Sequence, residues 1–239
     1  MCYRYSIYSK PELIEAKYQA TFQQEFPPTY HASAFSNTTL PIITNETRDH
    51  IILAAWGLIP PWAKTLQQAD DIKTKTANAR AETIYQKPSF RHAATHHHCV
   101  IIADGFFEWR EVLHRKYPYY IRMKSQKPFS MAGLWEPWIH PDTGETIITY
   151  SIITTQANPL MAVIHNTKKR MPVILPDGFE NLWLDATLPP EQAQQLLVPF
   201  EQEKMEAYTI SKLITAKDKD PNVSQVLAPY TYPGVDAQL

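Results

Sequence analysis

Apolar and β-branched residues fall into short runs separated by Pro, Asp and Gly, a pattern typical of a chain built mainly of strands. The runs predict strands over 51–58, 99–107, 117–123, 129–135, 146–155 and 172–175, with a hairpin turn at 142–144. Helices are predicted over 11–26, 89–97, 158–165 and 190–200. We therefore expect one α+β domain over residues 1–239, with a curled mixed or antiparallel sheet and peripheral helices.

The glycine and proline contents exclude several nucleotide-binding and hydrolase motifs. The chain has 239 residues but only 6 glycines, against 20 prolines. No two glycines lie close enough for a G-x-G-x-x-G loop, a Walker A loop or a G-x-S-x-G nucleophile elbow. The net charge is −1, so any contact with nucleic acid must come from a local basic patch.

Two cysteines, Cys2 and Cys99, exclude C-x-x-C redox motifs and all-cysteine zinc sites. They also argue against a disulfide framework, as expected for the reducing cytoplasm. No apolar run reaches the roughly 18 residues of a membrane span, and the first residues lack the apolar core of a signal peptide. We expect a cytoplasmic protein whose mature chain begins at Met1 or at Cys2.

Cys2 is the first candidate for chemistry, because removal of Met1 would give it both an α-amine and a thiol. The reference pKa values of these groups, about 8 and about 8.5, leave both nucleophilic near neutral pH. Such a 1,2-aminothiol captures an aldehyde as a Schiff base and then closes a thiazolidine ring. The alternative is that the residue at position 2 is incidental.

Three further sites carry polar residues suited to catalysis or binding. Glu108 ends a nearly uncharged run, where partial desolvation would raise its pKa into the range of a general acid. Asn78 and Arg80 would face the same way in an extended segment and could bind a sugar and its phosphate. His165 precedes the basic cluster 168–170. Each site also has a structural alternative. Glu108 could simply be the end of a strand, Asn78 and Arg80 could be the polar start of a helix, and the basic cluster after His165 could be a solvated loop.

A metal site is not expected at His96, His97 and His98, because consecutive side chains diverge and rarely bind one ion. We therefore expect no metal, and we also expect no cofactor.

Trp62 and Trp109 lie beside polar candidates and could stack on bases, although core packing is the alternative role for tryptophans.

Taken together, the motifs resemble the SRAP family, the SOS-response-associated peptidase or abasic-site processing proteins. The resemblance covers most of the chain and is carried by Met1-Cys2, 56–63 (WGLIPPWA), 78–83 (NARAET), Phe90-Arg91, 99–109 (CVIIADGFFEW), 132–136 (AGLWE), Thr154-Thr155, and His165 followed by 170–175 (RMPVIL). It implies the barrel-like fold of that family. It also implies binding to single-stranded DNA and a covalent bond to abasic sites through the N-terminal cysteine.

The resemblance also implies roles for individual residues. Cys2 would be the nucleophile, Asn78 would hold the α-amine or the sugar, and Glu108 would act as acid and base. His165 would protonate the sugar oxygen during ring opening or reversal. The DNA contacts would come from Arg4, Arg80, Trp109 and Arg170. No partner besides DNA and no membrane contact is implied, and we expect a monomer.

The chain departs from the family pattern at several positions. Tyr3 stands where relatives usually have glycine, and His96–His98 replace basic residues that commonly precede the cysteine of the main strand. Four residues separate His165 from Arg170, so Lys168 or Lys169 could take over the phosphate contact.

Two other functions fit the same residues. One is a thiol peptidase with Cys2 as nucleophile and His165 as base, which would include self-processing or cleavage of other proteins. The other is a non-covalent module for single-stranded nucleic acid, whose binding would weaken with salt.

Overall fold

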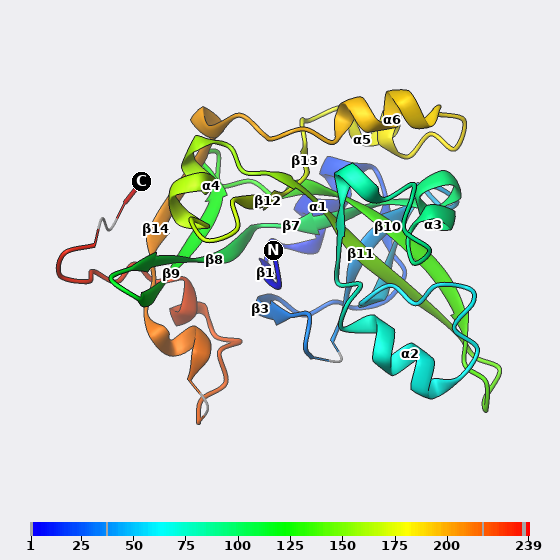
Figure 1. Cartoon of the computed structure of the whole chain (residues 1–239), viewed down its shortest axis with the longest axis horizontal. Helices are drawn as coiled ribbons and strands as arrows, with labels where there is room; N and C mark the ends of the chain where they lie inside the picture. Colours follow the sequence, from blue (N-terminus) through cyan, green and yellow to red (C-terminus); the bar gives the residue numbers. More distant parts are fainter. Residues whose placement is uncertain (1, 37, 217, 236–237) are drawn as a thin grey trace.

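A computed structural model of the chain describes residues 2–36, 38–216, 218–235 and 238–239 (Figure 1). The strands are β1 (Arg4–Ile7), β2 (Thr21–Phe22), β3 (Thr29–Ser33), β4 (Thr39–Thr44), β5 (His50–Trp56), β6 (Asn78–Arg80), β7 (His98–Ala103), β8 (Gly105–Val112), β9 (Arg115–Met123), β10 (Phe129–Ile139), β11 (Thr146–Gln156), β12 (Arg170–Pro172), β13 (Ile174–Leu175) and β14 (Met205–Thr209). The α-helices are α1 (Pro11–Tyr18), α2 (Leu66–Lys73), α3 (Arg91–His96), α4 (Pro159–Ile164), α5 (Glu180–Trp183) and α6 (Pro190–Leu196). Short 3-10 turns are η1 (Ala81–Thr83), η2 (Gln202–Lys204), η3 (Lys212–Thr215) and η4 (Ser224–Leu227).

Five strands of the larger sheet close into a barrel. They follow the order β11-β10-β7-β4-β5, and β5 also pairs in parallel with β11. That last pairing joins the two ends of the path, so the ring has no free edge between these strands. Every residue of β7 is buried, which explains why its sequence is a continuous apolar run rather than an alternating one.

A second sheet, in the order β14-β9-β8-β1-β3, is antiparallel throughout. It is connected to the barrel directly, because β7 runs into β8 with only Asp104 between them. The Asp104 carboxylate accepts hydrogen bonds from the backbone N–H groups of Tyr8 and Ser9. The chain bends at Asp104-Gly105, and the bend divides the predicted strand 99–107 between two sheets.

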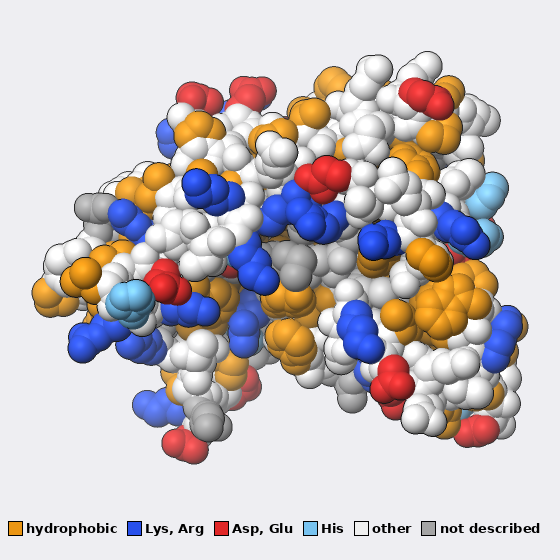
Figure 2. Space-filling model, viewed as in Figure 1, with side chains coloured by type: hydrophobic (Ala, Val, Ile, Leu, Met, Phe, Trp, Pro, Cys, Tyr) orange, Lys and Arg blue, Asp and Glu red, His pale blue; other side chains and the backbone are white. Residues whose placement is uncertain are grey.

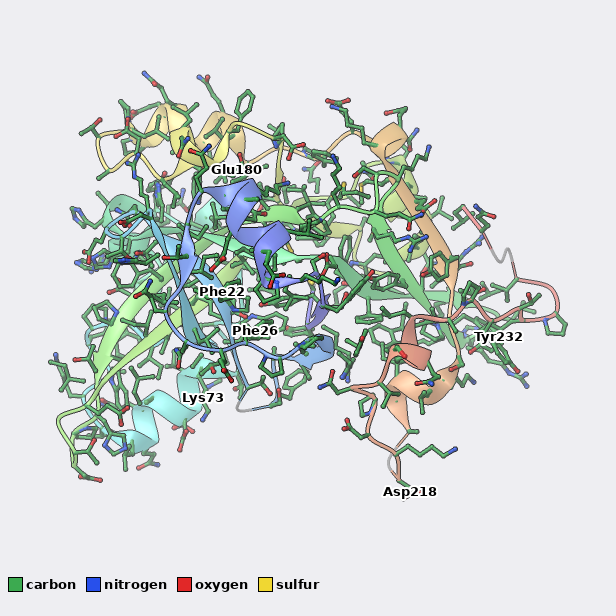
Figure 3. The ribbon with its side chains drawn as sticks, turned by 180° about the vertical axis from the view of Figure 1, so that it is seen from behind. Phe22, Phe26, Lys73, Glu180, Asp218 and Tyr232 are labelled. Atoms are coloured by element: carbon green, nitrogen blue, oxygen red, sulfur yellow. The ribbon has the colours of Figure 1, made fainter. Side chains whose placement is uncertain are left out.

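Helices lie around the outside of the sheets, as predicted for an α+β fold. Figure 1 shows α5 and α6 along one edge of the molecule and α2 along the opposite edge. The view from behind in Figure 3 shows α1 lying across that face, with the segment that carries Phe22 and Phe26 running beside it. The main core collects buried residues from β1 through β14.

The helix predicted over 11–26 is wrong beyond Tyr18. Gln19 adopts a left-handed conformation with φ 51°, which ends α1. Thr21 and Phe22 then pair in parallel with β5, and the rings of Phe22 and Phe26 stack 6.1 Å apart. The spacing of Phe22 and Phe26 is compatible with a helix, but the segment that carries them is extended.

The other predicted elements are confirmed with shifted ends. The β10–β11 hairpin turns at the expected residues, with Gly144 at φ +73°. The predicted helix at 158–165 is α4, and Asn158 caps it by accepting a hydrogen bond from the Met161 N–H. The elements that were not predicted are strands β1, β2, β3, β4, β6 and β14 and helices α2 and α5.

Gly105 makes the bend possible, because a Cβ atom there would overlap the ring of Tyr120. That ring cannot easily move, since its hydroxyl is hydrogen-bonded to Ser6 Oγ at 2.8 Å. We predict that Gly105→Ala lowers the free energy of unfolding by about 1–3 kcal/mol through overpacking. Urea denaturation measures the change. Gly144→Asn, in open space and in a conformation that Asn tolerates, is the control, and equal stability of the two variants would contradict the prediction.

Candidate functional site

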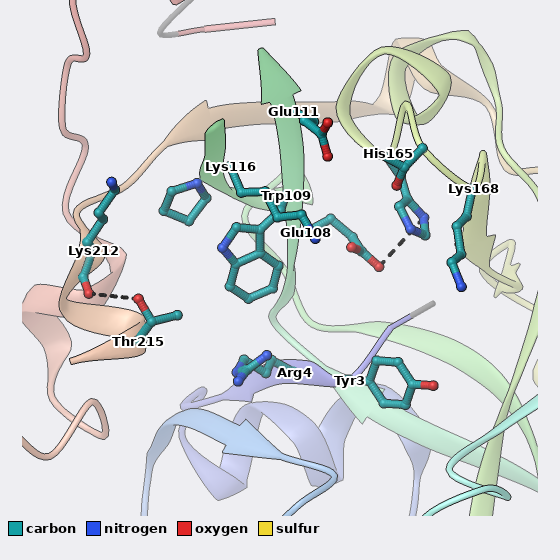
Figure 4. Close-up of a pocket in the computed structure, with 12 residues that line it drawn as sticks. Tyr3, Arg4, Glu108, Trp109, Glu111, Lys116, His165, Lys168, Lys212 and Thr215 are labelled. Atoms are coloured by element: carbon teal, nitrogen blue, oxygen red, sulfur yellow. Dashed lines mark hydrogen bonds and ion pairs between the residues drawn. The ribbon is translucent and has the colours of Figure 1, made fainter. Parts of the chain in front are cut away.

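A cleft of about 600 Å³ opens where the N-terminal strand meets β8, β9 and the segment after α4 (Figure 4). It is lined by Tyr3, Arg4, Glu108, Trp109, Glu111, Lys116, Pro118, His165, Thr167, Lys168, Lys212 and Thr215. In Figure 2, Lys and Arg side chains gather across the middle of the face, around the position where Figure 1 marks the N-terminus. A nearly neutral chain therefore presents a local cationic surface here.

Glu108 lies on the wall of this cleft with only 6% of its surface exposed. Strand β8 fixes its position, because Glu108 pairs with Tyr119 of β9 in the sheet. Burial raises the pKa of the carboxyl from 4.5 to about 7, although the nearby Arg4 guanidinium opposes the shift. Near neutral pH the group is therefore populated in both protonation states, as an acid–base catalyst must be.

His165 caps the C-terminal end of α4 and lies beside Glu108. Its Nδ1 atom donates to the backbone carbonyl of Arg170 at 2.8 Å and lies 3.8 Å from Glu108 Oε1. Burial, together with the charges of Lys168 and Arg170, lowers the pKa of His165 to about 4. The imidazole is therefore neutral at pH 7, with its proton on Nδ1 and an acceptor at Nε2.

Arg170 is buried, and its guanidinium is bound within the protein. It forms a two-pronged ion pair with Glu82, and Nη2 also donates to the Thr154 carbonyl. Since the guanidinium is held this way, the Arg170 carbonyl is a fixed acceptor for His165. Arg170 is not among the residues that line the cleft, whereas Lys168 is.

The Cys2 thiol is fully buried and points toward the backbone carbonyl of Arg4, with an Sγ to O distance of 3.6 Å. Burial raises the pKa of this thiol well above its ordinary value, and the negative charge of Glu108 adds to the shift. Cys2 therefore carries a neutral thiol in this state, which needs a base before it can react. Met1 lies outside the described residues.

Asn78 occupies a buried position on β6, next to Ile152 of β11. In the part of the chain that the structure describes, neither Asn78 Oδ1 nor Asn78 Nδ2 has a hydrogen-bond partner. A buried amide without partners is costly, and ligand binding is one reason for a protein to keep it. Arg80, on the same strand, is exposed and lies 4.0 Å from Glu82.

An aromatic and cationic pair flanks the carboxylate. The Arg4 guanidinium lies 5.0 Å from the centre of the Trp109 ring, and the two residues lie on one side of Glu108 in Figure 4. Tyr3 lies on the other side, stacked on Phe35 with ring centres 5.3 Å apart. Phe35 is 63% exposed, so the cleft is bordered by aromatic surface that unpaired bases could contact.

The structure thus brings four of the eight predicted site residues to the cleft wall: Arg4, Glu108, Trp109 and His165. Cys2 directly precedes Tyr3, which lines the cleft. Sequence reasoning missed Glu82, Tyr3–Phe35, Lys116 and Lys212. Glu82 stood inside a recognised motif, but nothing in the sequence indicated that it pairs with Arg170. Lys212 lies far along the chain, and no sequence pattern connects it with the site.

The sequence model of the SOS response associated peptidase (SRAP) family matches residues 1–217. The chain therefore belongs to this family. A curated relative, "Abasic site processing protein YoqW" of Bacillus subtilis, is 38% identical over 229 residues, covering 93% of this chain and 98% of that protein. "Abasic site processing protein HMCES" of Xenopus tropicalis is 31% identical, covering 74% of this chain and 60% of that protein.

Solved structures agree with this assignment. A crystal structure of a protein from Bacteroides thetaiotaomicron superposes with a TM-score of 0.89 at 39% identity, covering 95% of this chain and 98% of that one. A second, from Bordetella bronchiseptica, gives 0.78 at 28% identity, covering 88% and 100%. The expected α+β, barrel-like fold is confirmed. Among the described residues, no helix is long and apolar enough to cross a membrane.

The raised pKa of Glu108 predicts a pH-dependent cost to stability. The native state keeps this proton up to about pH 7, whereas the unfolded chain loses it near 4.5, so stability falls as the pH rises between these values. Glu108→Gln should therefore gain about 3 kcal/mol relative to wild type between pH 4.5 and pH 8. Urea denaturation at the two pH values measures this gain. Glu111→Gln, on the same strand, is the control, and parallel pH profiles for wild type and Glu108→Gln would rule out the burial effect.

Proposed function

We propose that this protein binds single-stranded DNA and joins covalently to abasic sites through the aminothiol of Cys2. The observation that carries the proposal is the buried Glu108, with its pKa near 7, acting electrostatically on the Cys2 thiol at the wall of a cationic, aromatic cleft. The names of its relatives support the substrate, since proteins 38% and 31% identical to this chain are called abasic site processing proteins.

The chemistry begins with removal of Met1, which places the α-amine on Cys2. The ring-opened sugar of an abasic site has an aldehyde at C1′. The amine adds to this carbon to give a carbinolamine. Protonated Glu108 then gives its proton to the departing hydroxyl, so that water leaves and a Schiff base forms.

In the second step, the carboxylate of Glu108 acts as a base instead of an acid. Glu108 is now ionised and accepts the proton of the Cys2 thiol, whose own pKa is too high for spontaneous ionisation. The thiolate adds to the carbon of the protonated Schiff base, whose nitrogen keeps its one remaining proton, and a neutral thiazolidine ring closes. The net reaction releases one water and consumes no oxidant or reductant.

His165 acts in the opening of the sugar ring rather than in deprotonation of the Cys2 thiol. Its neutral imidazole accepts the proton of the C1′ hydroxyl at Nε2 and returns it to the ring oxygen as the C1′–O bond breaks, which opens the ring. No imidazolium has to exist beforehand, which agrees with a pKa near 4. Arg170 positions this ring through its carbonyl, so we propose it as a positioning residue in place of a phosphate contact.

The remaining residues bind substrate. The unpartnered amide of Asn78 accepts a hydrogen bond from the α-amine or donates one to the sugar. Arg4, Arg80 and Lys168 neutralise phosphates, and Trp109 packs against a base. We also propose that the protein is a monomer and that its 239 residues form one domain. Two buried free cysteines suit the reducing cytoplasm, where the protein would associate with nucleoid DNA.

Peptidase activity is the second candidate, because the family description names it. A thiol peptidase needs a thiolate poised for attack. Here burial raises the pKa of the Cys2 thiol, which favours a reaction in which the amine attacks first. We therefore place aldehyde capture ahead of peptide cleavage and of non-covalent binding.

The central test mixes the protein with single-stranded DNA that contains one abasic site. Wild type should give a heat-stable shifted band on a denaturing gel, and Cys2→Ala should give none. Adding borohydride should restore a band for Cys2→Ala, because the amine still forms a Schiff base. Cys99→Ser, which alters the other buried thiol, should crosslink like wild type. A heat-stable band from Cys2→Ala without borohydride would contradict the proposal.

Glu108 should also set the pH dependence of the crosslinking rate. The neutral α-amine becomes more abundant up to about pH 8, whereas the acid form of Glu108, which expels the hydroxyl, is lost above about pH 7, so the wild-type rate should rise with pH and level off near 7. Glu108→Gln should be slower by about 10²–10⁴-fold, the usual contribution of a general acid or base, and should lose this levelling-off. Single-turnover rates between pH 5.5 and 8.5 measure both effects, with Glu111→Gln as the matched control. An unchanged pH profile in Glu108→Gln would remove Glu108 from the mechanism.

A further inference from the structure

Outside the cleft, three side chains form a compact group that we name the His–Glu cluster: His92, His97 and Glu136. The Nδ1 atom of His92 lies 2.6 Å from Glu136 Oε1, and Nδ1 of His97 lies 3.1 Å from Glu136 Oε2. One potential metal-binding atom from each residue lies within 4.8 Å of the other two. None of the three residues lines the cleft, so the proposed reaction does not account for them.

The fold holds this group at the joint between a helix and the barrel. His92 lies in the first turn of α3, and His97 is its C-cap residue. Glu136 lies on β10, where it pairs with Thr149 of β11 and is only 1% exposed. A carboxylate this deeply buried needs strong partners, and here two imidazoles face it. The stretch that contains His97 is also where this chain has histidines in place of the family's basic residues.

We propose that the His–Glu cluster binds a divalent transition-metal ion, with Zn²⁺ as the best match. Imidazole nitrogen and carboxylate oxygen without a thiolate suit Zn²⁺ and neighbouring ions rather than Mg²⁺ or Ca²⁺. Zinc bonds to these atoms of about 2.0–2.2 Å place tetrahedral ligands roughly 3.3 Å apart. The two nitrogen–oxygen distances, 2.6 and 3.1 Å, are slightly shorter than this spacing, and the three donor atoms lie within 4.8 Å of one another. The side chain of His92 is half exposed, so it has room to adjust when an ion binds.

Glu46 supports the ligand His97 from its other ring nitrogen. Glu46 Oε1 lies 3.8 Å from His97 Nε2, on the side of the ring away from Nδ1, where it can accept the Nε2 proton of a metal-bound imidazole. The His96 ring is centred 5.2 Å from the His92 ring. The neutral imidazoles bind through Nδ1, and the proton on that atom moves to Nε2 through solvent. No redox change is involved.

His98 has no part in this site, although it is adjacent to His97. Its ring stacks on Trp183 with centres 4.0 Å apart, and its two nitrogens contact the carbonyls of Trp183 and Ala94. The divergence expected for consecutive histidines therefore holds between His97 and His98. The metal ligands come instead from residues five apart in the sequence and from a strand.

The test is calorimetric titration of chelator-treated, full-length protein with Zn²⁺. We expect one ion per chain and a Tm that rises with Zn²⁺ concentration. His92→Gln and His97→Gln should each weaken the affinity more than tenfold. His114→Gln, which removes a fully exposed histidine elsewhere, should leave it unchanged. Far-UV circular dichroism of the zinc-free variants shows whether each has folded.

Three results would overturn the proposal. They are absence of stoichiometric Zn²⁺ binding by the folded protein, equal losses in His114→Gln and His97→Gln, and loss of binding in Cys2→Ala, which would move the ion to the cleft. Crosslinking to abasic DNA by His92→Gln should match wild type. The experiments therefore distinguish a wrong metal-site proposal from a wrong proposed function.

Discussion

The burial of one carboxylate, Glu108, is the constraint on which the site depends. Its strand β8 continues from the barrel strand β7 into the second sheet, where Glu108 pairs with Tyr119 of β9 and is almost completely buried. Burial then raises the pKa of Glu108 to about 7 and, through its charge, raises that of the Cys2 thiol. Acid and nucleophile are thereby coupled, since each disfavours ionisation of the other.

A second network holds the neighbouring His165 ring in one orientation and one tautomer, while burial keeps it neutral. The Glu82–Arg170 ion pair and the Thr154 carbonyl hold the Arg170 backbone, whose carbonyl accepts the Nδ1 proton of His165. Arg170 is buried although Glu82 is partly exposed, so loss of Glu82 would leave a buried guanidinium without its carboxylate partner, which is costly. The fold thus gives two adjacent groups pKa values about three units apart, near 7 for Glu108 and near 4 for His165. That separation lets one act as an acid while the other stays neutral.

The sequence predicted the parts of the fold that are buried on both faces. Strand β7 and the two strands of the β10–β11 hairpin are apolar and rich in β-branched residues, so their sequence patterns clearly predict strands. Strands β1, β3 and β6 are five residues or fewer and owe their structure to pairing with distant segments. Phe22 and Phe26 misled the prediction because two aromatics spaced like a helix packed instead from an extended chain.

The same distinction applies to the site. Cys2 and Glu108 could be identified because their chemistry depends on local features, a position at the chain start and a place at the end of an apolar run. The Arg170–Glu82 pair could not, because it joins residues 88 positions apart. No sequence pattern indicates whether a guanidinium faces DNA or an internal carboxylate. The stacking of Tyr3 on Phe35 is likewise a contact that only the folded chain reveals.

The most direct measurement of the central claim is the mass of the purified protein–DNA conjugate, followed by mapping of its N-terminal peptide. Our account predicts the mass of the protein without Met1 plus that of the DNA, less one water. The modification should lie on Cys2, with its thiol no longer free. A conjugate attached through a lysine such as Lys168, or one that leaves the Cys2 thiol free, would contradict it.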